Sequence, residues 1–203
     1  MRRLMLGILI MASVGIAAAV HAADANQDKK TAIATFAGGC FWCIEGPFDD
    51  VKGVKLTTSG YTGGSEKNPT YQQVSSKQTG HCEALEVEYD PARVTYAELL
   101  EVYWHNIDPT AGDHQFCDWG PQYRPVIFYH DDEQKRLAEA SRAEVEEKFG
   151  TVAVKIEPAG DFWPAEEYHQ DFYMKEPDHY SRYRKGCGRD KRLEELWGKA
   201  AGH

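Results

Sequence analysis

The sequence predicts an α+β protein: a two-layer sandwich with helices packed on a mixed central sheet, built around a ferredoxin-like core. The first observation is an alternation of strand-like and helix-like segments in the order strand, helix, strand, strand, helix, strand, helix, strand. The second is the length of 203 residues, which suits one domain once the N-terminus is set aside. Long Gly-rich loops between the elements are where functional residues are expected.

The individual elements follow from hydrophobic pattern and end signals. Thr95 and Glu98 form a capping box at the start of one helix. Asp131 caps a long amphipathic helix that Gly150 terminates. The predicted strands are 32–36, 54–59, 83–89, 126–129 and 152–156, and the predicted helices are 41–49, 95–106, 131–149 and a charged C-terminal one around 192–197.

The first residues have the pattern of a secretory signal. Arg2 and Arg3 precede an apolar run over 4–20, and Val20-His21-Ala22 offers a small-x-small cleavage site. The alternative is a retained anchor helix, because the run is near spanning length. We expect export to the periplasm or the cell exterior. The predicted divisions are a signal peptide (1–22), a flexible mature N-terminus (23–31) and a single catalytic domain (32–203).

The charge and the cysteine count restrict the function. The net charge of −9 argues against binding to nucleic acid or to anionic membranes. Five cysteines, an odd number, leave at least one free thiol in a monomer, which is the oligomeric state we expect. The domain is too large to need disulfides for stability, so redox chemistry is the first function to consider.

Cys40 is the candidate nucleophile. It follows Gly38-Gly39 at a predicted strand-to-helix turn, where glycines allow a sharp bend. The unpaired N–H groups and partial positive charge of a helix start stabilise a thiolate. Phe41 and Trp42 supply apolar walls beside it. The alternative is a structural cysteine in an aromatic core.

Cys43 lies three residues after Cys40, the spacing of thioredoxin-like redox motifs. This spacing also occurs in zinc sites, but a zinc site needs a second close pair of ligands. The other cysteines are scattered, and the histidines have no ligand-like spacing. We therefore expect no metal.

Glu83 is the candidate general acid. It shares the parity of Leu85 and Val87 on an alternating strand, so it points to the apolar face. Burial raises the pKa of a carboxyl group and lets it hold a proton at neutral pH. The alternative is a frayed strand end that leaves Glu83 exposed.

Three polar residues, Tyr71, Asp118 and Tyr123, lie in or beside the two long loops. Phenols near a reaction centre donate hydrogen bonds, and a carboxylate can orient them or hold a water. Taken singly, each is more typical of packing or of a turn.

Five motifs, in order, resemble the A-type peptide methionine sulfoxide reductases, and the resemblance runs from about Ala32 to about Trp197. It implies reduction of the S epimer of methionine sulfoxide, free or in proteins, which repairs oxidised proteins. The motifs are Gly39-Cys40-Phe41-Trp42-Cys43, Gly60-Tyr61-Thr62-Gly63-Gly64, Asn68-Pro69-Thr70-Tyr71, Gly80-His81-Cys82-Glu83 and Gln122-Tyr123-Arg124.

The resemblance also implies a role for each matching residue. Cys40 attacks the sulfoxide sulfur and becomes a sulfenic acid, and Glu83 protonates the sulfoxide oxygen. Phe41 and Trp42 hold the S-methyl group. Tyr71 and Tyr123 hold the oxygen, with Asp118 as their polar partner. No metal or organic cofactor is implied, only an external dithiol reductant such as a thioredoxin-like protein.

The resolving cysteine stays open between Cys43, the nearest in sequence, and Cys187 in the C-terminal segment. Cys82 and Cys117 flank Glu83 and Asp118, so either could also lie near Cys40. Two other functions compete: a thiol–disulfide oxidoreductase that uses Cys40 and Cys43, and a non-catalytic binding module.

Overall fold

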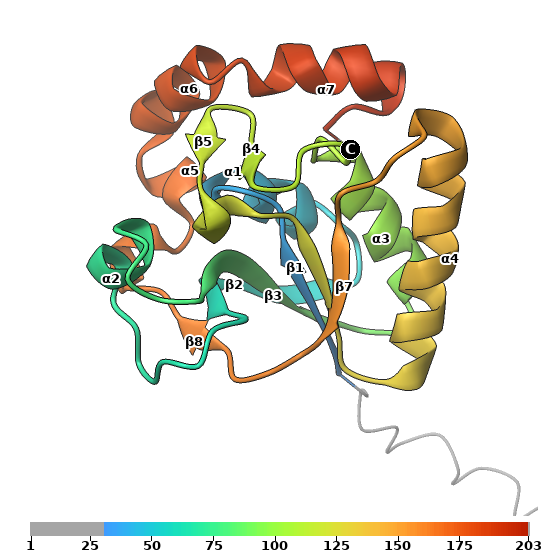
Figure 1. The fold of residues 1–203 in the computed structure, drawn as a ribbon, viewed down its shortest axis with the longest axis horizontal. Helices are drawn as coiled ribbons and strands as arrows, with labels where there is room; N and C mark the ends of the chain where they lie inside the picture. Colours follow the sequence, from blue (N-terminus) through green and yellow to red (C-terminus); the bar gives the residue numbers. More distant parts are fainter. Residues whose placement is uncertain (1–30, 203) are drawn as a thin grey trace, which may run out of the picture.

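The computed structural model describes residues 31–202 (Figure 1). The predicted signal peptide and all but the last residue of the predicted flexible N-terminus lie outside the described residues. Among residues 31–202, no helix is both long enough and apolar enough to cross a membrane.

The core of the fold is the predicted ferredoxin-like β-α-β-β-α-β unit. Its four strands lie in the order β6-β1-β3-β2, and every neighbouring pair is antiparallel. The α+β fold class is therefore confirmed. The unit comprises β1 (Ala32–Ala37), α1 (Phe41–Asp49), β2 (Val54–Thr62), β3 (Cys82–Tyr89), α3 (Tyr96–His105) and β6 (Val126–Tyr129).

Two strands extend this sheet to six. Helix α4 (Asp132–Phe149) leads to β7 (Lys155–Pro158), which pairs parallel with β6, and β8 (Trp163–Pro164) pairs with β2. The predicted strand at 152–156 was placed too early. Val152 and Val154 are buried as its pattern implied, but pairing with β6 begins only at Lys155.

The remaining elements surround one end of the sheet (Figure 1). The long loop after α3 contains a small hairpin whose position is fixed by Gln115, because its buried side-chain amide both accepts from and donates to the backbone of Asp108. These elements are α2 (Tyr71–Ser75), β4 (His114–Gln115), β5 (Asp118–Trp119), the short 3-10 helices Pro121–Tyr123, Glu167–His169 and Gly198–Ala200, α5 (Phe172–Lys175), α6 (Pro177–Gly186) and α7 (Arg189–Trp197).

The main hydrophobic core lies between the sheet and helices α1, α3 and α4. Phe36 of β1 is fully buried and stacks on Phe48 at 5.2 Å and on Tyr103 at 5.1 Å between ring centroids. The other face of the sheet packs against a smaller cluster that includes Cys82 and Phe128. Helices therefore cover one face, and the chain between β7 and β8 covers the other.

The predicted helix ends are confirmed where side chains determine them. Thr95 and Glu98 form the capping box of α3, and Asp131 caps α4, whose last residue precedes Gly150. Strand β2 runs three residues beyond its predicted end, to Thr62, because its last residues pair with Glu83 and Cys82 of β3.

Phe36→Ala should lower the free energy of unfolding by about 3–5 kcal/mol, because it leaves a cavity among stacked rings. Ile33→Ala is the matched control, since Ile33 lies in the same strand but is 38% exposed. It should change stability by less than about 1 kcal/mol. Urea denaturation measures both, and equal losses would contradict this description of the core.

Candidate active site

The turn between β1 and α1 presents Cys40. Gly39 has a φ of +87°, and a Cβ built there would lie 2.6 Å from Cβ of Gln115. Only glycine fits this close approach and left-handed backbone. Cys40 comes next, directly before the first residue of α1, as the sequence predicted.

Cys40 opens onto a small cavity of about 90 Å³. All the predicted site residues line this cavity except Cys43 and Cys187. Tyr183 also lines it, although the sequence did not predict this residue. The lining residues are Cys40, Phe41, Trp42, Tyr71, Glu83, Asp118, Tyr123 and Tyr183.

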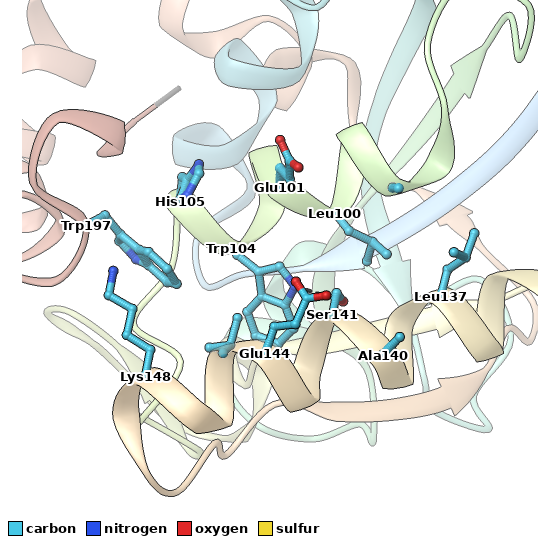
Figure 2. Close-up of a pocket in the computed structure, with 12 residues that line it drawn as sticks. Leu100, Glu101, Trp104, His105, Leu137, Ala140, Ser141, Glu144, Lys148 and Trp197 are labelled. Atoms are coloured by element: carbon cyan, nitrogen blue, oxygen red, sulfur yellow. Dashed lines mark hydrogen bonds between the residues drawn. The ribbon is translucent and has the colours of Figure 1, made fainter.

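A larger hollow of about 400 Å³ lies between α3, α4 and Trp197 (Figure 2). Trp104, Leu137 and the stem of Lys148 contribute to its walls. It contains no cysteine, so the candidate chemistry belongs to the smaller cavity.

Glu83 is buried, with 2% of its surface exposed, and it pairs with Tyr61 inside the sheet. The alternative of a frayed strand end is therefore wrong. One carboxyl oxygen, Oε2, accepts a hydrogen bond from the backbone N–H of Phe41 at 3.1 Å. Desolvation by burial raises the pKa of Glu83 to about 8, although that hydrogen bond acts in the opposite direction. Glu83 therefore holds its proton at neutral pH, beside the nucleophile.

Cys40 and Cys43 form a buried pair. Burial, above all, raises the pKa of Cys40, and its hydrogen bond with Cys43 and the nearby Glu83 act in the same direction. The same hydrogen bond lowers the pKa of Cys43 to about 7. Burial therefore acts against the thiolate that the sequence predicted for Cys40 at the helix start.

Trp42 is held flat against Phe172, with ring centroids 3.8 Å apart. Its indole Nε1–H donates to Nδ1 of His169 at 3.1 Å, so this histidine nitrogen is an acceptor. Burial lowers the pKa of His169, in agreement with a neutral ring. The ring of Tyr71 lies 4.4 Å from that of His169. His169 therefore joins two walls of the cavity.

Tyr71 begins the short helix α2. Its backbone N–H donates to Glu166 at 2.9 Å, and the other carboxylate oxygen of Glu166 accepts from the hydroxyl of Tyr61 at 2.8 Å. Glu166 therefore ties α2 to strand β2 and fixes where the Tyr71 ring enters the cavity.

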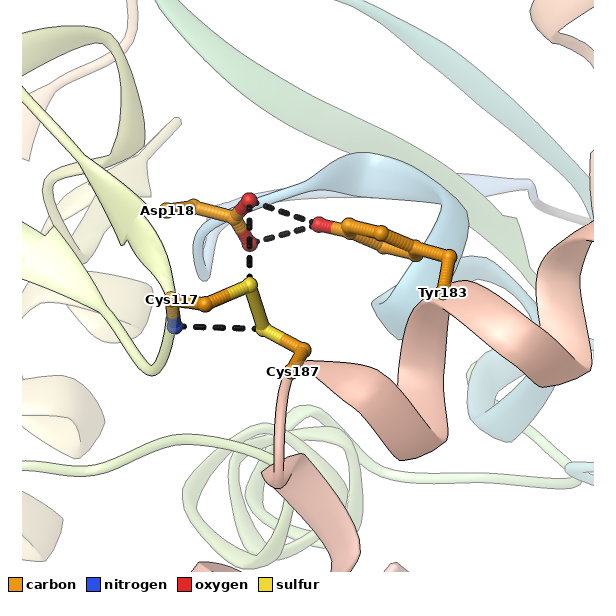
Figure 3. The surroundings of a disulfide bond; sticks show 4 residues. All are labelled: Cys117, Asp118, Tyr183 and Cys187. Carbon is orange, nitrogen blue, oxygen red and sulfur yellow. Dashed lines mark hydrogen bonds between the residues drawn. A yellow bond between two sulfur atoms is a disulfide. The ribbon is translucent and has the colours of Figure 1, made fainter.

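Asp118 lies at the start of β5, opposite α6. Its two oxygens are 2.7 and 2.6 Å from the hydroxyl of Tyr183, which donates to the carboxylate (Figure 3). Its hydrogen-bonding phenol is thus Tyr183, where the resemblance had implied Tyr71 and Tyr123 as partners. Tyr123 ends the 3-10 helix after β5 and lines the same cavity.

The other cysteines lie outside the cavity lining. Cys117 and Cys187 form a disulfide across 70 residues (Figure 3). This bridge was not predicted from the sequence, and it leaves Cys187 without a free thiol in this state. Cys82 alternates with Glu83 along β3, so it points to the opposite face of the sheet and is buried there.

Potential metal ligands gather at one place among residues 31–202: Cys117, Asp118 and Cys187 have ligand atoms within 4.8 Å of one another. Two of these three ligands are sulfurs already bonded to each other.

Sequence reasoning missed Tyr183, His169 and Glu166. All three follow β8, in a part of the chain where short helices and irregular segments give no periodic pattern. The one available signal was the density of aromatic and charged residues in this stretch.

The fold and the cavity define a thiol-dependent oxidoreductase that combines a nucleophilic cysteine with a protonated carboxyl group. The model of the family described as "Peptide methionine sulfoxide reductase" matches residues 32–201. The chain therefore belongs to this family, and its relatives identify the A type.

Three comparisons are informative. The chain is 49% identical over 178 residues to peptide methionine sulfoxide reductase MsrA of Bacillus subtilis, covering 85% of this chain and 99% of that one. Mxr1 from Saccharomyces cerevisiae in reduced form gives a TM-score of 0.69 at 34% identity, covering 73% of this chain and 87% of that one. Mxr1 in complex with Trx2 gives 0.50 at 27% identity, covering 70% and 85%.

The pH dependence of the first chemical step should follow Glu83. Its pKa of about 8 lies above the usual 4.5, so the acid is present below about pH 8 and is lost as pH rises through that value. Glu83→Gln should slow this step by about 10²–10⁴-fold at neutral pH. Rapid-quench single turnovers between pH 6 and 9.5 measure both effects.

The matched control is Glu88→Gln on the same strand, since Glu88 is only partly buried and lies outside the cavity. It should leave the rate and its pH profile unchanged. A normal rate in Glu83→Gln would remove Glu83 as the acid.

Proposed function

We propose that this enzyme reduces the S epimer of methionine sulfoxide to methionine, as free amino acid and in oxidised proteins. The observation that carries the proposal is the buried, protonated Glu83 in an aromatic cavity with Cys40. A sulfoxide needs such an acid, because its oxygen leaves sulfur only after protonation. Disulfide exchange needs neither the acid nor the cavity, and this favours sulfoxide reduction over the rival thiol–disulfide oxidoreductase.

Binding places the S-methyl group against Phe41 and Trp42. The stack of Trp42 on Phe172 makes this wall rigid, since neither ring can turn without losing the contact. The sulfoxide oxygen points toward Glu83 and the hydroxyls of Tyr71 and Tyr123. Burial raises the pKa of each phenol, so both hydroxyls keep the proton that they donate.

In the chemical step, Glu83 gives its proton to the sulfoxide oxygen and the sulfur becomes electrophilic. Cys40 loses its thiol proton and attacks this sulfur. The oxygen ends on the Cys40 sulfur as a sulfenic acid, and methionine leaves. The substrate sulfur is reduced by two electrons and the Cys40 sulfur is oxidised by two. The Cys40 proton restores Glu83.

Cys43 is the proposed resolving cysteine. With a pKa of about 7, it supplies thiolate at neutral pH beside the Cys40 sulfenic acid. Attack forms the Cys40–Cys43 disulfide, and the oxygen leaves as water once it takes up the proton that the Cys43 thiol released. A guanidinium N–H of Arg184 donates to the carbonyl of Cys43 at 3.1 Å, which holds this residue in place.

An external dithiol protein resets the enzyme by thiol–disulfide exchange. The complex of yeast Mxr1 with Trx2 supports a thioredoxin-like partner. The proposed enzyme works as a monomer and without a metal or an organic cofactor, because the steps above use only its own side chains. The signal-like N-terminus supports export to the periplasm or the cell exterior.

Cysteine variants test the scheme in single turnovers without added thiol. Cys40→Ser should form no methionine. Cys43→Ser should form one methionine per enzyme and keep a Cys40 sulfenic acid that dimedone traps. Mass spectrometry of the wild type should find a Cys40–Cys43 bridge after S-sulfoxide but not after R-sulfoxide. Cys82→Ser, on the other face of the sheet, should behave as wild type.

Methionine formation by Cys40→Ser would end the scheme. A bridge from Cys40 to any cysteine other than Cys43 would keep the activity and correct the resolving step. Insulin disulfide reduction without methionine formation would favour the thiol–disulfide oxidoreductase instead.

Export predicts a mature protein that begins at Ala23. The full chain is expressed in a bacterium, and each cell fraction is analysed by intact mass. The periplasmic or secreted fraction should hold the shortened protein, whereas a chain without residues 1–22 should stay in the cytoplasm. Uncleaved protein in the membrane fraction would instead indicate a retained anchor.

A further inference from the structure

The C-terminal segment from Tyr183 to Arg189 forms the outer wall of the active site. The Tyr183 hydroxyl donates to Asp118, and Arg184 donates to the carbonyl of Cys43. A guanidinium N–H of the fully buried Arg189 donates to the carbonyl of Gly38 at 3.0 Å. This one segment therefore contacts the cysteine turn and the carboxylate across the cavity.

The disulfide joins the backbone of this segment to the backbone that carries Asp118. Cys117 is the residue directly before Asp118. Cys187 lies one helical turn after Tyr183, and its N–H donates to the Tyr183 carbonyl at 2.9 Å. The two Cα atoms of the bridge are 5.0 Å apart. The disulfide therefore lies one helical turn from Tyr183 and one residue from Asp118 (Figure 3).

Helix α6, which carries Tyr183, lies at the surface and contributes no residue to a hydrophobic core. None of its residues is buried, so hydrophobic packing does not anchor it as it anchors α1 and α3. The Arg189 guanidinium lies 4.4 Å from the ring centroid of Phe116, a second contact between the same two segments. Polar and covalent contacts, together with ring contacts at the surface, therefore determine where Tyr183 lies.

We propose that Cys117 and Cys187 are positioning residues for catalysis: their disulfide holds the Tyr183 phenol on Asp118 and so fixes the polar wall of the substrate cavity. The proposal rests on the proposed function, because the wall it fixes is that of the sulfoxide site. Tyr183 also meets Trp42 edge-on at 5.9 Å, so its place affects the methyl-binding corner as well.

Loss of the bridge frees α6 and the β4–β5 hairpin to move apart. The hydrogen bond between Tyr183 and Asp118 then forms for only part of the time. Substrate contacts weaken more than the reaction of Cys40, because Cys40, Cys43 and Glu83 belong to α1, its preceding turn and β3. The effect should therefore appear mainly in KM.

A double-mutant cycle tests the proposal in the full mature domain. The variants are Cys117→Ala/Cys187→Ala, Tyr183→Phe and the triple combination; the paired alanines avoid a new free thiol. Steady-state kcat and KM are measured with free methionine S-sulfoxide and a thioredoxin as reductant. Tyr173→Phe is the matched control, since its hydroxyl donates to Asp49 at 2.9 Å, outside the cavity.

We expect the paired alanines and Tyr183→Phe each to lower kcat/KM by about tenfold, mostly through KM. The triple variant should have the same kcat/KM as either parent variant, because both changes remove the same Tyr183–Asp118 interaction. The single-turnover Cys40–Cys43 bridge should still form at one methionine per enzyme. Tyr173→Phe should retain wild-type values.

A wild-type KM in the paired alanines would overturn the proposal, and so would losses of kcat/KM that multiply in the triple variant. A changed number of methionines per enzyme would also overturn it, because Cys117 and Cys187 would then carry electrons. If Tyr183→Phe unfolds on thermal denaturation, Asp118→Asn replaces it in the cycle. If the paired alanines unfold, Cys117→Ser/Cys187→Ser replaces them. Failure of the wild type to form methionine would instead reject the proposed function itself.

Discussion

A carboxyl group kept away from water is the constraint on which this active site depends. Glu83 lies inside the ferredoxin-like sheet, where a charge is costly, and therefore keeps its proton. Its carboxyl group accepts a hydrogen bond from the N–H of Phe41, the residue after Cys40, so this contact fixes Glu83 relative to the turn that carries Cys40. The hydrophobic core around Phe36 supports both, because it packs β1 and β3 beneath α1.

The two cysteines at the start of α1 differ in their electrostatic surroundings. Burial and the neighbouring Glu83 disfavour a charge on Cys40, whereas the hydrogen bond from Cys40 favours a charge on Cys43. In the proposed mechanism, Cys40 therefore carries its proton until substrate enters, and the hydrogen bond from Cys40 prepares Cys43 for the second step.

The sequence predicted the parts of the site that local rules determine. Strand parity placed Glu83 inside, and the Gly-Gly turn placed Cys40 at a helix start. It did not predict the Cys117–Cys187 bridge or Tyr183, since these depend on how a non-periodic C-terminal segment folds back over the sheet. The start of β7 was missed for a similar reason: pairing with β6, rather than its own apolar pattern, determines it.

The two redox-sensitive places of this protein differ in accessibility. Cys40 and Cys43 are buried, whereas Cys117 is exposed at the surface. A small dithiol in an assay buffer meets the surface bridge first, while a protein reductant must recognise a particular face of the enzyme. An assay with dithiothreitol can therefore measure enzyme in which the Cys117–Cys187 disulfide is reduced, whereas an assay with a protein donor measures enzyme in which it is intact. The oxidation state of this bridge is best verified before rates from the two assays are compared.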